Sequence, residues 1–404
     1  MNFAIKEYPR VSARRLEEPK VIPLSAPAIR GNEWKYVKEC LDTGWVSSAG
    51  PFVERFEAEV CRFTGARHAV ACVNGTAALH VALRLAGVQP GDEVIVPTLT
   101  FIAPVNAVHY LGASPVFMDC DRYYNLDAVK TAAFIHDHTT FKDGHTYNRV
   151  TWRKISALVP VHVFGNAAEL EMLGLLCRER NIKVVEDATE GLGTVYSQGV
   201  HRGMHSGTIG DLGCFSFNGN KIITTGGGGM LVTNHTEYAE KARYLTTQAK
   251  DDEVHYVHHE VGYNYRLTNI QAALGVAQLE QLPEYLDIKL RNYLVYQSRL
   301  GGVPGLHLAD APPYARNNHW MYALQIDARR YGCSPSELMQ RLTEQRIQSR
   351  PVWQLCHLQR PYRQAQTYRI DHAPRLHDAT LNIPCSVGLE IQDVERIARV
   401  LNRD

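Results

Sequence analysis

The chain has 404 residues, which is too long for one simple hydrophobic core and therefore predicts two domains. Its composition, 45% hydrophobic and 21% charged, is typical of a globular protein with a large core. The net charge of +1 gives no sign of the concentrated basic face that nucleic-acid binding requires, so no nucleic-acid partner is expected. The short basic cluster Arg10, Arg14 and Arg15 is interpreted as a solvated arm.

The cysteines and the N-terminus point to a cytoplasmic protein. The nine cysteines form no C-x-x-C pair, and several lie in apolar segments, as Cys72 and Cys214 do. This pattern favours buried free thiols over disulfides or a zinc site. The first 20 residues lack the apolar core of a signal peptide, and no apolar run approaches about 18 residues. We therefore expect no membrane span.

Helical and strand patterns alternate from residue 31 to about residue 250. The expected helices cover residues 50–65, 76–87, 101–112 and 168–180, and Gly65 is expected to end the first of them. The expected strands cover residues 68–73, 93–97, 114–119, 155–165, 181–188, 212–217 and 230–234. Strand, helix and strand at this spacing predict an α/β fold with a parallel sheet wrapped by helices.

A polar segment at residues 121–153 interrupts this alternation. It contains His136, His138 and His145, but their spacing matches no zinc signature, and no cysteine or glutamate completes a site. The segment is expected to be a solvated insertion without a metal.

The pattern changes after about residue 275. Residues 278–300 predict a long helix that is broken near Pro283, and residues 319–326 predict a strand. The sequence SPSE at 334–337 predicts a capping box, and residues 390–402 predict a last amphipathic helix. We therefore expect a large domain at residues 1–275 and a smaller α+β domain at residues 276–404.

Two candidate ligand groups follow predicted strands, at the end of a parallel sheet where ligands usually bind. Asp187 lies at the tip of one strand, where a carboxylate serves a helix cap or turn as often as an active site. Asn74, Gly75 and Thr76 open a helix, whose free N–H groups and positive end suit a phosphate. A plain strand-to-helix turn has the same pattern.

Lys221 stands between the apolar segment 212–217 and the glycine run 226–229, with Ile222 and Ile223 beside it. Desolvation lowers the pKa of an amine and makes the amine a nucleophile toward an aldehyde. The alternative is a lysine that extends from a loop into solvent. The glycine run precedes a strand, whereas nucleotide-binding loops precede a helix.

Two further residues have weaker signals. Phe101 follows the strand 93–97, where it either stacks on a flat ring or packs in the core. His162 lies in an apolar segment and fits a hydrogen-bonded core histidine at least as well as a site residue.

Together these segments resemble the DegT/StrS family of sugar aminotransferases from about residue 22 to the end, most specifically over GDLGCFSFNGNKIITTGGGGMLVTN at 210–234. The resemblance implies the fold-type I architecture of pyridoxal phosphate (PLP) enzymes and an obligate homodimer. It implies that Lys221 binds the cofactor covalently and that Asp187 pairs with the pyridine nitrogen. The remaining roles that it implies are phosphate binding by Gly75, Thr76 and Ser216, ring stacking by Phe101, and contact of Asn264 with the phosphate in the partner subunit.

One residue departs from the family pattern. Much of the family has glutamine where this chain has Glu190, next to the cofactor's ring oxygen. A glutamate changes the local charge, so the role of Glu190 is less defined by the resemblance than that of Asp187.

The polar insertion and the NGNKIITTGGGG segment resemble the branch that aminates UDP-4-keto-6-deoxy-N-acetylhexosamines. That resemblance implies a UDP-linked keto-sugar as acceptor and L-glutamate as amino donor, in surface-glycan or nonulosonic acid biosynthesis. A non-catalytic sugar-sensing relative and a PLP-dependent sugar dehydratase of the same fold are the alternatives. The first predicts loss of the lysine and the second replaces it with histidine, whereas Lys221 is present.

Overall fold

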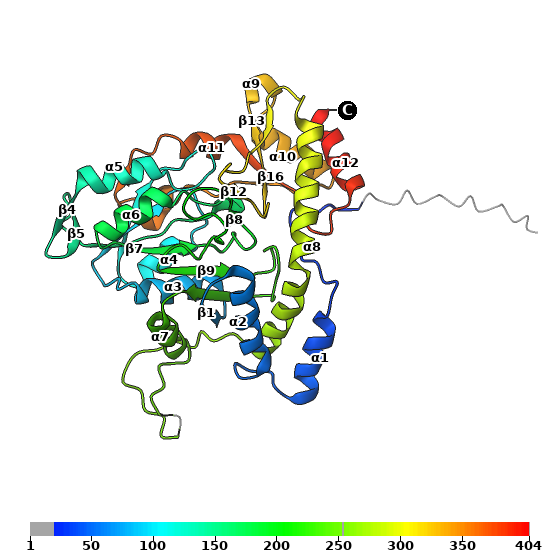
Figure 1. Ribbon diagram of the computed structural model, residues 1–404. Helices are drawn as coiled ribbons and strands as arrows, with labels where there is room; N and C mark the ends of the chain where they lie inside the picture. Colours follow the sequence, from blue (N-terminus) through cyan, green and yellow to red (C-terminus); the bar gives the residue numbers. More distant parts are fainter. Residues whose placement is uncertain (1–19, 253, 404) are drawn as a thin grey trace, which may run out of the picture.

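The computed structural model describes residues 20–252 and 254–403, and Arg10, Arg14 and Arg15 lie outside them (Figure 1). An eight-stranded sheet forms the centre of the molecule. Its strands, in spatial order, are β1 (His68–Cys72), β10 (Gly229–Thr233), β9 (Leu212–Ser216), β7 (Lys183–Asp187), β6 (Ile155–Leu158), β2 (Glu93–Pro97), β3 (Ser114–Met118) and β15 (Thr367–Tyr368). Only β10 is antiparallel to its neighbours, so the expectation of a mostly parallel sheet is confirmed.

Both faces of the sheet are buried, as the period-2 pattern of β1 illustrates. Ala69 and Ala71 belong to one apolar core, and Val70 and Cys72 belong to another. The first core includes residues of α2 (Pro51–Thr64) and α8 (Asn269–Leu300), and the second includes residues of α3 (Gly75–Leu85), α4 (Ala103–Tyr110) and α7 (Thr236–Thr246). α2 ends at Gly65, which adopts the expected left-handed conformation with φ of 77°.

The prediction of a solvated insertion at 121–153 is wrong in part. Residues Ala128–His138 form α5, whose Phe134 and Ile135 are fully buried against the sheet with α6 (Glu171–Glu179). The apolar residues of α5 form a buried side that anchors the helix, within a segment that is polar elsewhere. The hairpin of β4 (Thr139–Lys142) and β5 (His145–Asn148) follows. Among the described residues, no group of histidine, cysteine, aspartate and glutamate side chains could hold a metal ion.

The expected strand 155–165 is also too long. β6 ends at Leu158, and a 3₁₀ turn at Val163–Gly165 follows, in which Phe164 has a φ of 57°. The N–H of Phe164 donates to the Glu190 carboxylate at 2.8 Å rather than to a neighbouring strand. A side chain from elsewhere in the fold thus replaces the strand ladder here.

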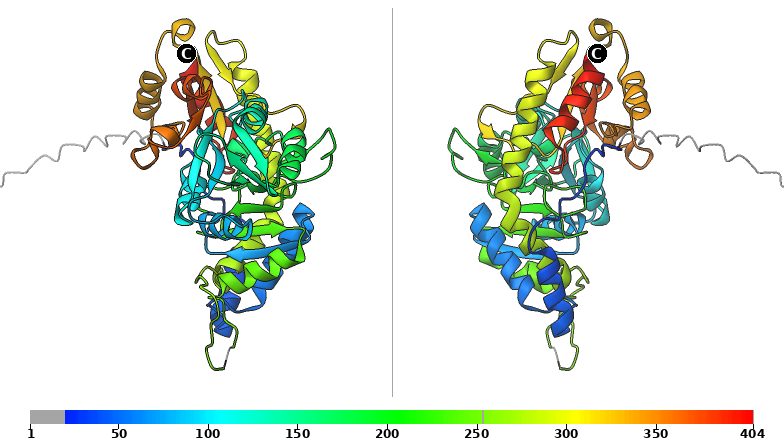
Figure 2. Two further views of the ribbon diagram at one scale, coloured as in Figure 1. Left: turned by 90° about the vertical axis from the view of Figure 1, so that its left-hand side faces the viewer. Right: turned by 90° about the vertical axis from the view of Figure 1, so that its right-hand side faces the viewer.

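The predicted break near Pro283 is wrong, because α8 is one helix of 32 residues. Proline removes a single backbone donor, and the packing of α8 against α1 (Glu33–Thr43), α2 and α12 (Ile391–Asn402) compensates for that loss. Figures 1 and 2 show α8 running along one side from the large sheet to the C-terminal part. A domain boundary at residue 275 falls inside this helix and stays a prediction.

The C-terminal part has its own apolar core around a four-stranded sheet. The predicted capping box is present, since the Ser334 N–H donates to Glu337 at 2.7 Å. The predicted strand 319–326 begins later than expected, at Tyr322. The remaining elements are β8 (Val195–Tyr196), β11 (Leu306–Leu308), β12 (Ala315–Arg316), β13 (Tyr322–Ile326), α9 (Ala328–Tyr331), α10 (Pro335–Glu344), β14 (Arg350–Pro351), α11 (Ala373–Ala379), β16 (Thr380–Ile383) and 3₁₀ turns at Cys356–Leu358 and Arg360–Tyr362.

A bilayer-spanning helix would need a long apolar stretch, and none of the helices in the described ranges has one.

Candidate active site

The phosphate turn and Ser216 meet at one edge of the large sheet. β1 and β9 both flank the antiparallel β10, so they run in the same direction and end at the same edge. A Cβ on Gly75 would lie 3.0 Å from the Cβ of Ser216 and 3.0 Å from Cγ2 of Thr189. Only glycine therefore fits where α3 begins beside these two side chains.

Helix α3 begins with backbone N–H groups that have no partner within the helix. The Asn74 side chain accepts from the N–H of Ala77 at 2.7 Å and so caps the helix. The first N–H groups of a helix have no partner within it, and the helix dipole adds positive charge at this end. Gly75 and Thr76 stand at that end, so the turn has the donors and the field that a phosphate needs.

Asp187 ends β7 at the same edge and is 2% exposed. Its carboxylate accepts from the N–H of Thr189 at 3.1 Å, and burial raises its pKa. Within the described ranges, Asp187 forms no salt bridge. A buried carboxylate that forms no salt bridge suits the ring N–H of a pyridinium, whose charge would compensate the cost of burial.

Lys221 is not a solvent-exposed loop residue, because its side chain is only 13% exposed. Its Nζ lies 3.6 Å from Oε1 of Glu190 and 4.1 Å from the ring centre of Trp320. Lys221 also lies close enough to Asp187 to lower the pKa of that carboxyl. The structure therefore brings Lys221, Asp187 and Glu190 together.

Glu190 also has a raised pKa. Burial raises its pKa to about 7, although the charge of Lys221 and the hydrogen bond from the Phe164 N–H act in the opposite direction. Glu190 is thus able to hold or release a proton near neutral pH beside the lysine amine.

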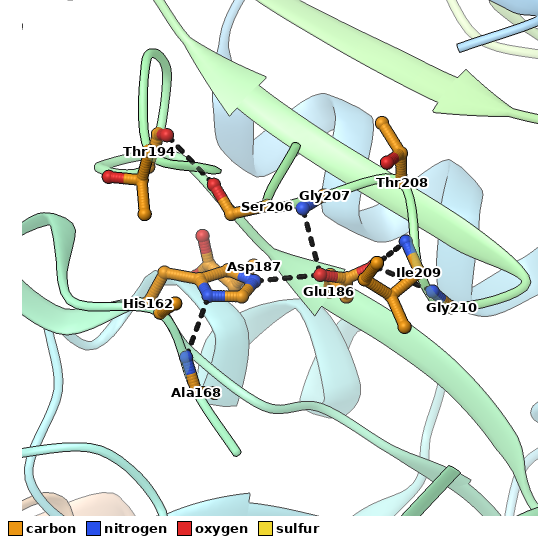
Figure 3. A network of polar contacts seen from close by, with 12 residues as sticks. His162, Ala168, Glu186, Asp187, Thr194, Ser206, Gly207, Thr208, Ile209 and Gly210 are labelled. Carbon is orange, nitrogen blue, oxygen red and sulfur yellow. Dashed lines mark hydrogen bonds and ion pairs between the residues drawn. The ribbon is translucent and has the colours of Figure 1, made fainter. Parts of the chain in front are cut away.

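His162 is a hydrogen-bonded core histidine, and Figure 3 shows why. Its Nδ1 accepts from the N–H of Ala168 at 3.0 Å, so Nε2 carries the proton and donates to Glu186 at 2.8 Å. The Glu186 carboxylate also accepts from the N–H groups of Gly207, Ile209 and Gly210 (Figure 3). Burial opposes ionisation of Glu186, but these hydrogen bonds hold its pKa below the usual range. The network anchors Glu186, which directly precedes Asp187 at the carboxyl end of β7.

The two remaining candidates are Phe101 and Asn264. Phe101 is 53% exposed, and its ring centre lies 6.4 Å from that of Trp353, so its face is available for stacking. Asn264 is exposed and pairs with Thr247 in an isolated bridge. Its contact with a partner subunit stays a prediction.

Two residues of the site were missed from the sequence. Trp320 covers Lys221, and the side chain of Asn318 donates to the carbonyls of Glu190 and Leu192 at 2.7 and 2.8 Å. Asn318 lies in a polar run that resembles an ordinary loop, and Trp320 lies in the expected strand 319–326, where a core residue is the usual interpretation.

The described geometry agrees with the comparisons with known proteins. The model of the DegT/DnrJ/EryC1/StrS aminotransferase family matches residues 27–402. The chain belongs to this family. It is 40% identical to a GDP-perosamine synthase of Caulobacter vibrioides over 387 residues, which cover 95% of this chain and 98% of that protein. It is 39% identical to a putative PLP-dependent aminotransferase, EpsN, of Bacillus subtilis, over 84% and 83% of the two chains.

Solved structures of the family have the same fold. DesI, crystallised in the presence of its TDP-sugar product, matches with a TM-score of 0.83 and 28% identity over 96% of this chain and 93% of DesI. A family aminotransferase from Brucella abortus matches with a TM-score of 0.81 and 26% identity over 92% and 95%. The chain is therefore a PLP-dependent sugar aminotransferase of fold-type I that acts in nucleotide-sugar biosynthesis.

The residues at the sheet edge fit this cofactor. With PLP bound, Lys221 would supply the amine for its aldehyde, Asp187 the anion for its ring nitrogen, and the turn at Gly75 and Thr76 the donors for its phosphate. When bound, PLP supplies an electron sink through which an amino group passes from a donor to a ketone.

Glu190→Gln is expected to change how the stability of the cofactor-free protein depends on pH. The pKa of Glu190 is raised from 4.5 to about 7, so its contribution to stability is complete below pH 4.5 and falls until the pH passes 7. The difference is on the order of 3 kcal/mol across that window. Melting temperatures measured from pH 4.5 to 8 should fall for the wild type relative to Glu190→Gln up to pH 7 and then run parallel. If the melting temperatures of the wild type and Glu190→Gln run parallel over the whole pH range, the raised pKa of Glu190 is contradicted.

Proposed function

We propose that Lys221 binds PLP covalently. Its amine, when freed during the reaction, would act as general base and acid and move a proton between the substrate carbon and the cofactor carbon that bears the aldehyde. The observation that carries this proposal is the buried position of its amine beside Glu190, at the sheet edge that also holds Asp187. Asp187 pairs with the ring nitrogen, Gly75, Thr76 and Ser216 bind the phosphate, and Phe101 stacks on the ring.

The reaction we propose is transfer of an amino group from L-glutamate to C4 of a nucleotide-linked 4-keto-6-deoxy sugar. The acceptor must carry a ketone, because the amino group replaces a carbonyl oxygen at the carbon that receives it. The nucleotide adds binding energy remote from the reacting carbon and orients the carbonyl. The test is incubation of the purified protein with PLP, glutamate and a panel of nucleotide keto-sugars, with the products identified by mass.

Two candidate acceptor sugars differ in the nucleotide that they carry. The names of three relatives favour GDP, since GDP-perosamine synthases of Caulobacter vibrioides, Escherichia coli O157:H7 and Vibrio cholerae are 40%, 35% and 36% identical to the chain. The sequence of residues 218–229 and the insertion 121–153 favour UDP-4-keto-6-deoxy-N-acetylglucosamine. We propose the GDP-linked sugar first, because that likeness extends over 95% of the chain in two of the three relatives.

A competition assay distinguishes the two candidates. With both keto-sugars present at equal concentration, we expect kcat/KM for the GDP-linked sugar to exceed that for the UDP-linked N-acetyl sugar by at least about tenfold. The reverse preference would assign the chain to the UDP branch and leave the aminotransferase activity intact. A dTDP-linked keto-sugar is tested as a third substrate in the same assay.

Two side chains, those of His357 and Arg350, are candidates for binding the diphosphate of the nucleotide-sugar. His357 Nδ1 lies 2.5 Å from Oγ1 of Thr98, just beyond β2, and burial lowers its pKa. Arg350 is exposed on β14. The contact with Thr98 places His357 beside the end of β2, whereas the Arg350 side chain donates to the carbonyl of Ser349.

We propose a homodimer in which Asn264 completes the phosphate site of the partner subunit. Mixing Lys221→Ala with Asn264→Ala subunits should then restore up to about a quarter of the wild-type activity, because one of the two sites in a mixed dimer has both residues. Recovery of no activity despite proven subunit exchange would place Asn264 in its own subunit's site or outside any site.

A further inference from the structure

Trp320 lies where the chain enters β13, against the lysine of the active site. Its side chain is 2% exposed, and its ring centre is 4.1 Å from Nζ of Lys221. Its indole N–H donates to the carbonyl of Asn220 at 2.8 Å. The face of the ring packs against the end of the Lys221 side chain, and the indole N–H fixes the peptide group just before Lys221.

The main chain of Trp320 is held on both sides. Its N–H donates to Oδ1 of Asn318 at 2.8 Å, and Nδ2 of the same amide donates to the carbonyl of Glu190 at 2.7 Å. Its carbonyl accepts from Nζ of Lys289 at 3.0 Å. The two groups that flank the Lys221 amine, Glu190 and the indole, are therefore linked through one asparagine.

Lys289 is a second buried lysine, on α8, and it is also 2% exposed. Its Nζ donates to the carbonyls of Trp320 and Cys385, at 3.0 and 2.6 Å. In the part of the chain that the structure describes, no carboxylate lies within salt-bridge distance of it. Burial lowers its pKa. Its amine donates to two backbone carbonyls, so Lys289 is a hydrogen-bonded tether rather than a counter-ion.

We propose that Trp320 is a positioning residue for Lys221, and that Lys289 and Asn318 hold Trp320 in place. The freed amine of Lys221 then rests between the Glu190 carboxyl and the indole ring instead of turning into solvent. Helix α8 and the small sheet thereby set the location of the amine that reacts with the cofactor. This role concerns the family reaction and does not depend on which sugar is the acceptor.

The test measures how fast added PLP attaches to Lys221 in the cofactor-free protein, by absorbance and by the mass of the borohydride-reduced peptide. Trp320→Leu is expected to slow attachment about tenfold. Trp320→Phe keeps an aromatic face and should lie between Trp320→Leu and the wild type. Lys289→Met removes both donors and should also slow attachment. Lys289→Gln keeps an NH₂ group and should recover most of the rate.

A matched control separates positioning from general destabilisation. Tyr296→Leu removes a buried ring from α8 two turns beyond Lys289, within the core of the small sheet. It should lower the melting temperature at an unchanged attachment rate. Equal slowing in Tyr296→Leu, or a wild-type rate in Trp320→Leu, would overturn the proposal. If Trp320→Leu fails to fold, equal rates in Lys289→Met and Lys289→Gln would overturn it.

Discussion

Lys221→Ala is expected to lose turnover by at least about 10⁴-fold and to remain folded. A primary amine forms a Schiff base with an aldehyde, and neither Glu190 nor Trp320, which lie beside the Lys221 amine, can replace that chemistry. The fold survives because Glu190 is not left as an isolated anion. Its pKa, already about 7 with Lys221 present, rises further without that charge, so it takes up a proton.

The measurements are colour, labelling and melting temperature. Wild-type protein with PLP should be yellow, and borohydride should place the reduced cofactor on Lys221. The variant should carry no label, and its stability should change by no more than about 1 kcal/mol. Lys183→Ala is the control, since Lys183 also lies near a carboxylate, 3.1 Å from Asp211, but at the other end of β7. A label on a lysine other than Lys221 would contradict the proposal that Lys221 binds the cofactor.

The fold was predictable from the sequence where local pattern and tertiary packing agree. β1 alternates between two cores, and Gly65 ends α2, as periodicity and glycine chemistry require. The failures lie where distant contacts override the local pattern. Phe164 leaves the predicted strand because its N–H binds Glu190, and α8 continues through Pro283 because other helices pack along it.

The candidate site divides in the same way. Asp187 and Gly75 follow strand ends, so the rule for parallel sheets was enough to select them. Glu190 was found only through the family resemblance. Trp320 was not predicted, because Asn220 and Trp320 are 100 residues apart and meet only once the small sheet is in place. The same holds for the tether from Lys289, which no spacing within α8 indicates.

Asp187→Asn is expected to separate stability from catalysis. Burial raises the pKa of Asp187, which means that the cofactor-free protein bears a cost for the ionised carboxylate at neutral pH. An asparagine has the same shape, and its Oδ1 can still accept from the Thr189 N–H. The variant's cofactor-free form should therefore be at least as stable as the wild type at pH 7. Its Tm advantage should shrink as the pH falls and the wild-type carboxyl becomes protonated.

Catalysis should respond in the opposite direction. Without the carboxylate, the ring nitrogen of the bound cofactor loses the anion that keeps it protonated, so the barrier should rise by several kcal/mol, on the order of 10²–10³-fold in kcat. Asp211→Asn makes the same change at the opposite end of β7, where Asp211 accepts from the N–H of Val184, and should alter kcat by less than about twofold. A wild-type kcat in Asp187→Asn would mean that this carboxylate serves only the turn at Thr189, because an asparagine fills that role equally well.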